Sequence, residues 1–280
     1  MSIATPPSPI PADPNAIPDR KDLEREFHNR RERDRQQDAA SFLDRYPNKK
    51  FYALARSSKA FMNRWMARHA PGSRALAYCC GLGQDAIELA RLGAKDVVGI
   101  DISDVSIETA RREAEAAGVA DRTRFLVMDA ERTSFPDDSF DVIVVNGCLH
   151  HLDLAAAFAE LRRILTPNGR IICTEALAHN PIVMAYRRRT PHLRTAFEVD
   201  HILRVEDIRR ALESFDRVDI RFFHLASIAA LPLRTTRLFS PALAVLDAVD
   251  GAILRIPGLR RWAWQAIFEL SGPKGKDAVA

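Results

Sequence analysis

The chain of 280 residues is 47% hydrophobic and 28% charged, and its formal net charge is +4. This length can bury a sizeable core as one domain with embellishments, and no apolar stretch is long and charge-free enough to cross a bilayer. Four cysteines without a Cys-x-x-Cys pair, and no apolar secretion signal, predict reduced thiols, a cytoplasmic location and no zinc site.

Two N-terminal regions precede the predicted core. Residues 1–18 contain six of the sixteen prolines and predict a disordered, extended tail. Residues 19–71 contain two amphipathic helical stretches, at about 20–45 and 50–69, and we interpret them as a helical lid. Helices in this position are expected to pack at the ligand-binding edge of the sheet that follows.

Residues 72–176 alternate short apolar runs with amphipathic helical patterns. Because strands that alternate with helices are joined by right-handed crossovers, this alternation predicts a doubly wound α/β fold with a mostly parallel sheet. A turn at 166–169 is expected to precede the fifth strand. The predicted strands are 74–79, 96–101, 123–129, 140–146 and 169–176, and the predicted helices are 84–93, 106–118 and 154–165.

Residues 177–280 are expected to complete the sheet and to bind the acceptor. A predicted helix at 205–215 is followed by predicted strands at 217–225 and 262–270, which brings the number of strands to seven. From Pro181 onward, sixteen Lys and Arg stand against eleven Asp and Glu. This surplus indicates either contact with acidic lipid surfaces or phosphorylated substrates, or an ordinary solvated face.

A helical insertion at 226–261 separates the last two predicted strands, and its prolines divide it into short helices. In a sheet of this type, the sixth strand runs parallel to the others and the seventh returns antiparallel. The insertion, the segment 177–203 and the N-terminal helices are therefore expected to roof one cleft at the ligand edge. A roof rich in Leu, Ala, Phe and Trp implies a largely apolar acceptor.

A glycine-rich loop follows the first predicted strand, with Gly81 and Gly83 one residue apart and Ala86 three residues further on. Dinucleotide enzymes use this pattern, in which a helix N-terminus holds a pyrophosphate. Asp85 argues against a pyrophosphate, because its carboxylate stands in the first turn of the helix. A cationic ligand without phosphate fits better, and S-adenosylmethionine, with its sulfonium and ammonium groups, is such a ligand.

The acidic residues after the next two strands fit the rest of this cofactor. Gly81 and Gly83 would let the backbone approach the methionine part closely. Asp101 would accept hydrogen bonds from both ribose hydroxyls, and Asp129 would take the adenine amino group beside the backbone N–H of Ala130. The carboxyl ends of neighbouring parallel strands meet at one edge of a sheet, so these groups are expected to converge.

The order of these pieces resembles the class I S-adenosylmethionine-dependent methyltransferases, in particular the small-molecule branch near the ubiquinone/menaquinone C-methyltransferases. The resemblance covers roughly 72–176 and rests on CCGLGQDAIELA, VVGIDIS, VMDAE, FPDDSFDVIVVNGCLHHL and LRRILTPNGRIICTEA. It implies a seven-stranded Rossmann-like sheet, methyl transfer and S-adenosylmethionine as the cofactor. With this resemblance, the predicted cofactor-binding residues are Cys79, Gly81, Gly83, Asp85, Asp101, Ile102, Asp129, Ala130, Asn146 and Gly147.

The loop departs from the family pattern at two positions. The family usually has an acidic residue in the first strand and a glycine at the start of the loop, where this chain has Ala77 and Cys79. The carboxylate normally helps to orient the loop and the methionine ammonium. Asp85 either takes over part of this role or only caps its helix, and weakened cofactor binding is an open alternative.

Four residues are candidates for chemistry at the acceptor. His150 and His151 follow the fourth strand at the ligand edge, where an imidazole could remove a proton from a hydroxyl or an acidic carbon. Packing of the loop is the alternative role of this pair. Tyr186 and His201 lie in the segment 175–202, whose Arg, His and Tyr in an apolar setting indicate acceptor binding. Further candidates are His28, Glu175 and His192.

These features predict O- or C-methylation of a small, apolar or amphipathic acceptor. A nucleic-acid substrate is not expected, because Asn-Gly-Cys-Leu replaces the Asn/Asp-Pro-Pro-aromatic loop and no basic stripe is interleaved with aromatic residues. An NAD(P)-dependent oxidoreductase, and a non-catalytic or membrane-associated protein that retains the fold, are alternatives. Arginines of the insertion could support peripheral contact at a membrane surface, and a lid or homodimer surface is the competing interpretation.

Overall fold

The computed structural model describes residues 19–195, 197–198 and 201–276, so the tail predicted at 1–18 lies outside the described residues. The strands are β1 (Arg74–Tyr78), β2 (Asp96–Asp101), β3 (Thr123–Val127), β4 (Phe140–Asn146), β5 (Leu165–Ala176), β6 (Phe215–Phe223) and β7 (Gln265–Pro273). They form one sheet in the order β3-β2-β1-β4-β5-β7-β6. β7 is antiparallel to β5 and β6, and the other pairs are parallel. The predicted doubly wound, mostly parallel, seven-stranded α/β sheet is confirmed.

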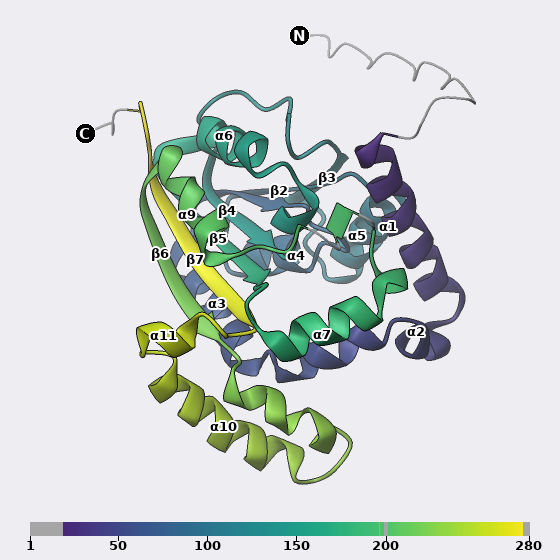
Figure 1. Cartoon of the computed structure of the whole chain (residues 1–280). Coiled ribbons are helices and arrows are strands. Elements are labelled where there is room, and N and C mark those ends of the chain that lie inside the picture. The colour runs from purple at the N-terminus through teal and green to yellow at the C-terminus, as the bar shows by residue number, and fades with distance from the viewer. Residues whose placement is uncertain (1–18, 196, 199–200, 277–280) are drawn as a thin grey trace.

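Helices cover both faces of the sheet (Figure 1). The α-helices are α1 (Arg20–Gln37), α2 (Ala39–Arg45), α3 (Arg56–His69), α4 (Gln84–Arg91), α5 (Asp104–Ala116), α6 (Leu154–Ile164), α7 (Pro181–Arg189), α9 (Val205–Arg209), α10 (Phe239–Ile253) and α11 (Pro257–Arg260). The 3₁₀ helices are η1 (Pro47–Leu54), η2 (Leu149–His151), η3 (Pro191–Leu193), η4 (Arg210–Glu213) and η5 (Ala226–Leu233). Because side chains alternate along a strand, Ala75 and Ala77 of β1 pack with α3, α4 and α5, whereas Leu76 and Tyr78 pack with α6 and α9.

The turn predicted at 166–169 is wrong, because these residues lie within β5. The pairing of β4 with β5 changes register there: Phe140 pairs with Leu165, but Val142 pairs with Arg170. The extra residues of β5 therefore form an irregular, bulged section instead of a separate turn. Bulges of this kind bend a strand without ending it.

A third apolar cluster joins the N-terminal helices to the segments after the core. It is formed by η1, α7, η5 and α10, and Ala176 at the end of β5 packs against it. Its buried members are Phe51, Leu54, Val183, Ile228, Ala230, Leu243 and Trp264. In Figure 1, α10 lies beyond α7 at the bottom of the view. None of the described helices has both the length and the apolar character needed to cross a membrane.

Candidate active site

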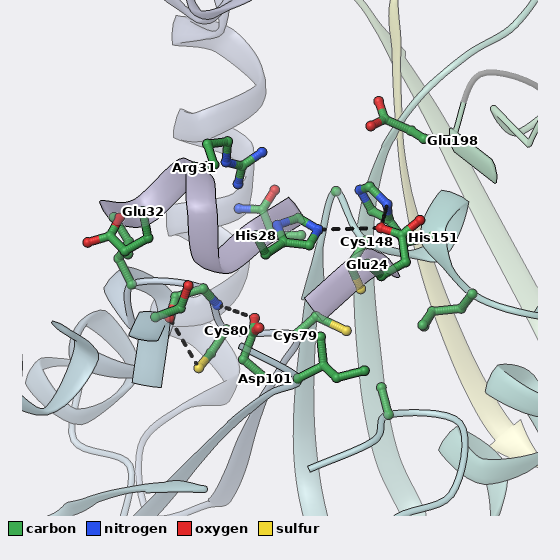
Figure 2. Close-up of a pocket in the computed structure, with 18 of the residues that line it drawn as sticks. Glu24, His28, Arg31, Glu32, Cys79, Cys80, Asp101, Cys148, His151 and Glu198 are labelled. Carbon is green, nitrogen blue, oxygen red and sulfur yellow. Dashed lines mark hydrogen bonds and ion pairs between the residues drawn. The ribbon is translucent and has the colours of Figure 1, made fainter. Parts of the chain in front are cut away.

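A cavity of about 480 Å³ opens at the carboxyl ends of β1 to β4, and side chains of α1 form its opposite wall (Figure 2). This volume lies within the range of small-molecule binding sites. Nine of the ten predicted cofactor-binding residues line the cavity. These nine are Cys79, Gly81, Asp85, Asp101, Ile102, Asp129, Ala130, Asn146 and Gly147. The fold thus brings together residues from the ends of four strands.

The two glycines of the loop have different roles. The backbone N–H of Gly81 donates to Asp101 Oδ2 at 2.8 Å, and a Cβ on Gly81 would meet no atom within 4 Å. Gly81 therefore ties the loop to the end of β2 and leaves the cavity open. Gly83 does not line the cavity, and its φ of 82° places it in the left-handed region before α4. A Cβ there would lie 2.9 Å from the Phe125 ring, so packing, and not approach of a ligand, requires this glycine.

The departures from the family pattern have visible consequences at Cys79 and Asp85. Cys79 has a φ of 53°, a left-handed conformation that costs a non-glycine residue about 1–2 kcal/mol. Asp85 stands in the first turn of α4, and its Oδ2 accepts a hydrogen bond from Asn146 Nδ2 at 3.1 Å. Burial raises the pKa of Asp85, and the bond from Asn146 opposes this rise. The carboxylate of Asp85 therefore faces the cavity and Asn146.

Two basic residues of α1, which sequence reasoning missed, line the cavity beside Asp129, the residue predicted to bind adenine. Lys21 forms ion pairs with Asp129 and Glu131, and Arg20 pairs with Glu131 and donates to the backbone oxygen of His151. An adenine amino group would therefore compete with Lys21 for Asp129. The amphipathic helical pattern at 20–45 located this helix, but it did not indicate which residues point into the cavity.

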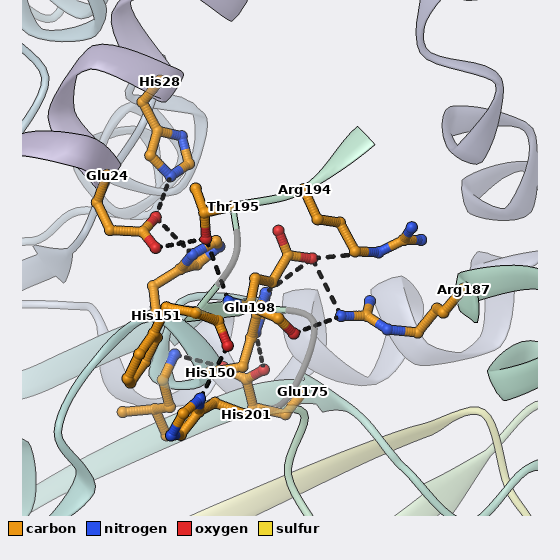
Figure 3. Close-up of polar contacts among 12 residues, drawn as sticks. Glu24, His28, His150, His151, Glu175, Arg187, Arg194, Thr195, Glu198 and His201 are labelled. Atoms are coloured by element: carbon orange, nitrogen blue, oxygen red, sulfur yellow. Dashed lines mark hydrogen bonds and ion pairs between the residues drawn. The ribbon is translucent and has the colours of Figure 1, made fainter. Parts of the chain in front are cut away.

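His150 is held by a buried carboxylate. Its Nδ1 lies 2.7 Å from Oε2 of Glu175, which is 1% exposed, and Glu175 Oε1 accepts a hydrogen bond from the N–H of Leu149 at 2.7 Å (Figure 3). Burial lowers the pKa of His150, but Glu175 and Glu198 together outweigh burial, so the pKa lies above its ordinary value. The ring is fixed in this way with its Nε2 3.8 Å from Glu198 Oε1. An imidazole oriented by a carboxylate has the arrangement of a general base.

His151 faces a different carboxylate, that of Glu24 in α1. His151 Nδ1 lies 2.9 Å and His28 Nε2 3.7 Å from Glu24 Oε2. Burial, assisted by the neighbouring His150, lowers the pKa of His151 to about 4, against the pull of Glu24. The donor atoms of Glu24, His28 and His151 lie within 4.8 Å of one another, and could hold a metal ion, but their mutual contacts also account for the cluster.

A second cavity, of about 100 Å³, adjoins the first at Asn146, Gly147 and His150. Tyr186 lines it, as predicted for the acceptor, and its ring packs edge-on to Phe51 with centroids 5.0 Å apart. The other walls include Tyr52, Val183, Trp264, Arg187, Arg194 and Glu198. No residue of the insertion 226–261 lines either cavity, so the expectation that it roofs the cleft is corrected: it packs behind η1.

His201 is not brought to the site. It is exposed, its ring stacks on Phe197 at 3.7 Å between centroids, and its Nδ1 lies 2.8 Å from the backbone oxygen of Phe197 (Figure 3). His201 and the exposed His192 line neither cavity. Tyr186, His150 and His151 thus line the cavities, whereas His192 and His201, which belong to the same segment as Tyr186, do not.

Comparisons with known proteins agree with this geometry. Residues 76–173 match the family model described as a methyltransferase domain. A 27-O-demethylrifamycin SV methyltransferase of Amycolatopsis mediterranei is 39% identical over 36% of this chain and 37% of its own length. A demethylmenaquinone methyltransferase of Symbiobacterium thermophilum is 32% identical over 38% of this chain and 43% of its own length.

Among solved structures, phosphoethanolamine N-methyltransferase 2 of Haemonchus contortus has a TM-score of 0.59 at 16% identity, covering 89% of this chain and 60% of that chain. At this identity the likeness shows the fold alone. The chain spans less than half the length of the two curated relatives. The matched residues 76–173 contain the glycine loop, Asp101, Asp129 and the histidine pair. Residues 76–173 are therefore similar to a methyltransferase domain, as the sequence resemblance implied.

Proposed function

We propose that this protein transfers a methyl group from S-adenosylmethionine to an oxygen or an acidic carbon of a small, apolar or amphipathic acceptor, with His150 as the general base. The observation that carries this proposal is the buried His150–Glu175 pair, which lies at the junction of the two cavities. A base at this point would stand between the cofactor and the acceptor.

The residues of the larger cavity fit the cofactor. Gly81 leaves open space for a ligand, Asp101 lines the cavity where it could accept from the ribose hydroxyls, and Asp85 offers a carboxylate to an ammonium group. Seven carboxylates against four Lys and Arg line the cavity, and this surplus of negative charge, which includes Asp85, Asp101 and Asp129, suits a cation better than a pyrophosphate and disfavours the oxidoreductase alternative. When bound, S-adenosylmethionine supplies an electrophilic methyl group on a sulfonium.

The work left to the protein is alignment, exclusion of water and removal of one proton. His150 Nε2 is the ring nitrogen available to the acceptor, because Nδ1 lies 2.7 Å from Glu175 Oε2, whereas Nε2 has only Glu198 Oε1 beside it, at 3.8 Å. It would take the proton from the acceptor hydroxyl or carbon, and the carboxylate of Glu175 would stabilise the imidazolium that forms. The aromatic walls of the second cavity, among them Phe51, Tyr186 and Trp264, support an acceptor with an apolar body.

Methyl transfer can be tested with the full chain, radiolabelled S-adenosylmethionine and a panel of apolar phenols and prenylated compounds. We expect transfer of label to at least one phenol, and its loss in His150→Gln with binding of S-adenosylhomocysteine retained. Transfer that survives in His150→Gln would remove the base from the proposal. A chain that binds S-adenosylhomocysteine but labels no member of the panel would contradict the acceptor class.

A second candidate role is peripheral contact with an anionic membrane surface. Of the eleven large hydrophobic side chains that are exposed among the described residues, five lie between 238 and 262. The two acidic residues of this stretch, Asp247 and Asp250, are largely buried, whereas its arginines add positive charge. Cosedimentation with phosphatidylglycerol vesicles, and not with phosphatidylcholine vesicles, is the expected result; a concentration-dependent dimer would favour the competing interpretation.

A further inference from the structure

The second cavity contains two buried guanidinium groups. Arg187 of α7 has a side-chain exposure of 12%, and Arg194, which follows η3, has one of 4%. Taking a guanidinium this far out of water is costly unless opposite charge and hydrogen bonds replace the lost hydration. The groups around the two arginines therefore decide whether the cavity is complete without a ligand.

A single carboxylate serves both arginines. Glu198 Oε1 lies 3.2 Å from Arg187 Nη2 and 3.5 Å from Arg194 Nε. The other carboxylate that lines the cavity, Glu175, uses both of its oxygens on His150 Nδ1 and the N–H of Leu149. Lys50 adds a further positive charge, with its Nζ 5.1 Å from the centre of the Tyr186 ring. Positive groups thus outnumber the carboxylates available to pair with them.

Unsatisfied polar atoms are concentrated at the same place. In the described part of the chain, seven buried side-chain nitrogen or oxygen atoms lack a hydrogen-bond partner, and five of them belong to residues that line the second cavity. These five are Asn48 Oδ1, Thr174 Oγ1, Tyr186 Oη, Arg187 Nε and Arg194 Nε. Native proteins leave few such atoms, so a group of them around one cavity indicates a missing polar ligand.

The chemistry of these five atoms identifies the kind of ligand. Four of the five atoms can donate: both arginine Nε atoms carry N–H donors, and the hydroxyls of Thr174 and Tyr186 can donate as well, whereas Asn48 Oδ1 only accepts. Donors and positive charge together select an anionic oxygen group, for which planar guanidinium is the preferred partner. A volume of about 100 Å³ suits a headgroup and not a whole acceptor.

We propose that the second cavity binds a carboxylate or phosphate group carried by the acceptor, through Arg187, Arg194 and Tyr186. The aromatic walls then hold the apolar body beside this headgroup, and His150, which lines both cavities, faces the reacting atom. The acceptor is therefore an amphipathic anion. This inference rests on the proposed methyl transfer for the identity of the ligand as acceptor, but binding of the anion can be measured without it.

Calorimetric titrations of the full chain, saturated with S-adenosylhomocysteine, test the proposal. The probes are benzoate, inorganic phosphate and benzamide, which is the uncharged counterpart of benzoate. We expect benzoate or phosphate to bind at least about 10-fold more tightly than benzamide, because hydrogen bonds to charged groups contribute about 1.5–3 kcal/mol. Equal binding of benzoate and benzamide with no binding of phosphate, or no binding of any probe, would overturn the proposal.

Substitutions locate the anion. Arg194→Gln and, independently, Arg187→Gln should weaken anion binding about 10-fold or more, whereas Arg188→Gln, on the exposed side of α7, should leave it unchanged. Undiminished binding in both of the first two variants would place the anion elsewhere and overturn the proposal. S-adenosylhomocysteine is titrated in parallel as a test of folding. If the unmodified chain does not bind S-adenosylhomocysteine, the result counts against the proposed function. If it binds S-adenosylhomocysteine but does not prefer anions, the result counts against this inference alone.

Discussion

The cofactor side and the acceptor side of the site are held in place by different means. On the cofactor side, Asp101 stands at the end of β2 and accepts a hydrogen bond from the backbone of Gly81. On the acceptor side, the polar groups come from η1, η2, β5 and the segment around α7, and they include side-chain pairs such as His150–Glu175. The sheet therefore fixes the first side, whereas the second depends on partners from distant parts of the chain.

This difference predicts a division of effects. A substitution on the cofactor side should change the affinity for S-adenosylhomocysteine, and a substitution on the acceptor side should change turnover or acceptor binding. His150 is a point at which the two sides meet, because it lines both cavities. The four predictions below run from the largest expected effect to the smallest.

His150→Gln should separate the two sides most clearly. Loss of a general base lowers kcat about 10²- to 10⁴-fold, and the affinity for S-adenosylhomocysteine should stay within about twofold because His150 is not among the predicted cofactor-binding residues. Steady-state kinetics and calorimetry on the same preparation check both values. His192→Gln is the matched control, since His192 is exposed and lines neither cavity. A parallel loss of cofactor affinity in His150→Gln would break the division.

Acid should destabilise the structure that supports the acceptor side. His224 is fully buried, with Nε2 2.9 Å from Ser58 Oγ of α3 and Nδ1 3.1 Å from Ser227 Oγ of η5. Burial lowers the pKa of His224 to about 4, although Asp250 opposes this, so the unfolded chain binds the proton more readily. Stability is fully present above pH 6.5 and should fall by about 3 kcal/mol as the pH drops from about 6.5 to about 4.

Urea unfolding at a series of pH values measures this loss. The control is His224→Asn, since asparagine tolerates the φ of 66° that His224 adopts. The difference in pH dependence between the two proteins isolates the imidazole from the other titrating groups. Identical pH profiles would show that His224 is not the group responsible.

Asp101→Asn probes the cofactor side alone. The variant loses the charge that would bind the ribose hydroxyls, and it weakens the bond with the Gly81 backbone, so the Kd for S-adenosylhomocysteine should rise about 10- to 100-fold. Asp96→Asn, at the opposite end of β2, serves as the control and should bind normally. Unchanged affinity in Asp101→Asn would refute the assignment of this carboxylate to the cofactor.

Cys79→Gly should have the smallest effect, on stability. Glycine removes the cost of the left-handed conformation at Cys79 but adds entropy to the unfolded chain, which leaves a net gain of about 0.5–1 kcal/mol. Cys80→Gly is the control, because Cys80 is not at a positive φ and should only lose stability. Chemical denaturation compares the two variants. Destabilisation of both would mean that the Cys79 side chain contributes packing worth more than the strain.

The sequence was sufficient to predict which residues line the larger cavity, because strand ends and the glycine loop are local patterns. Asp101 and Asp129 each follow an apolar run directly, and parallel strands bring such ends to one edge. The role of Gly83 was not accessible in this way, since the ring of Phe125 that requires a glycine belongs to a strand some forty residues later.

The acceptor side was predictable only in outline. The segment 175–202 was recognised by its composition, but Tyr186 and Arg194 enter the second cavity whereas His201 faces outward, and composition does not specify direction. The insertion 226–261 follows β6 at the expected edge of the sheet, but it packs against η1 and lines neither cavity. Pairs such as Glu24 and His151, which lie far apart in the sequence, depend on how α1 docks on the sheet.

Titration of S-adenosylhomocysteine and, separately, of NAD into the unmodified full chain tests the central claim most directly. The acidic lining of the larger cavity and its glycine loop predict saturable binding of S-adenosylhomocysteine at a single site and no heat of binding for NAD. Absence of S-adenosylhomocysteine binding would contradict the account. Saturable binding of NAD in its place would favour the alternative function, an NAD(P)-dependent oxidoreductase.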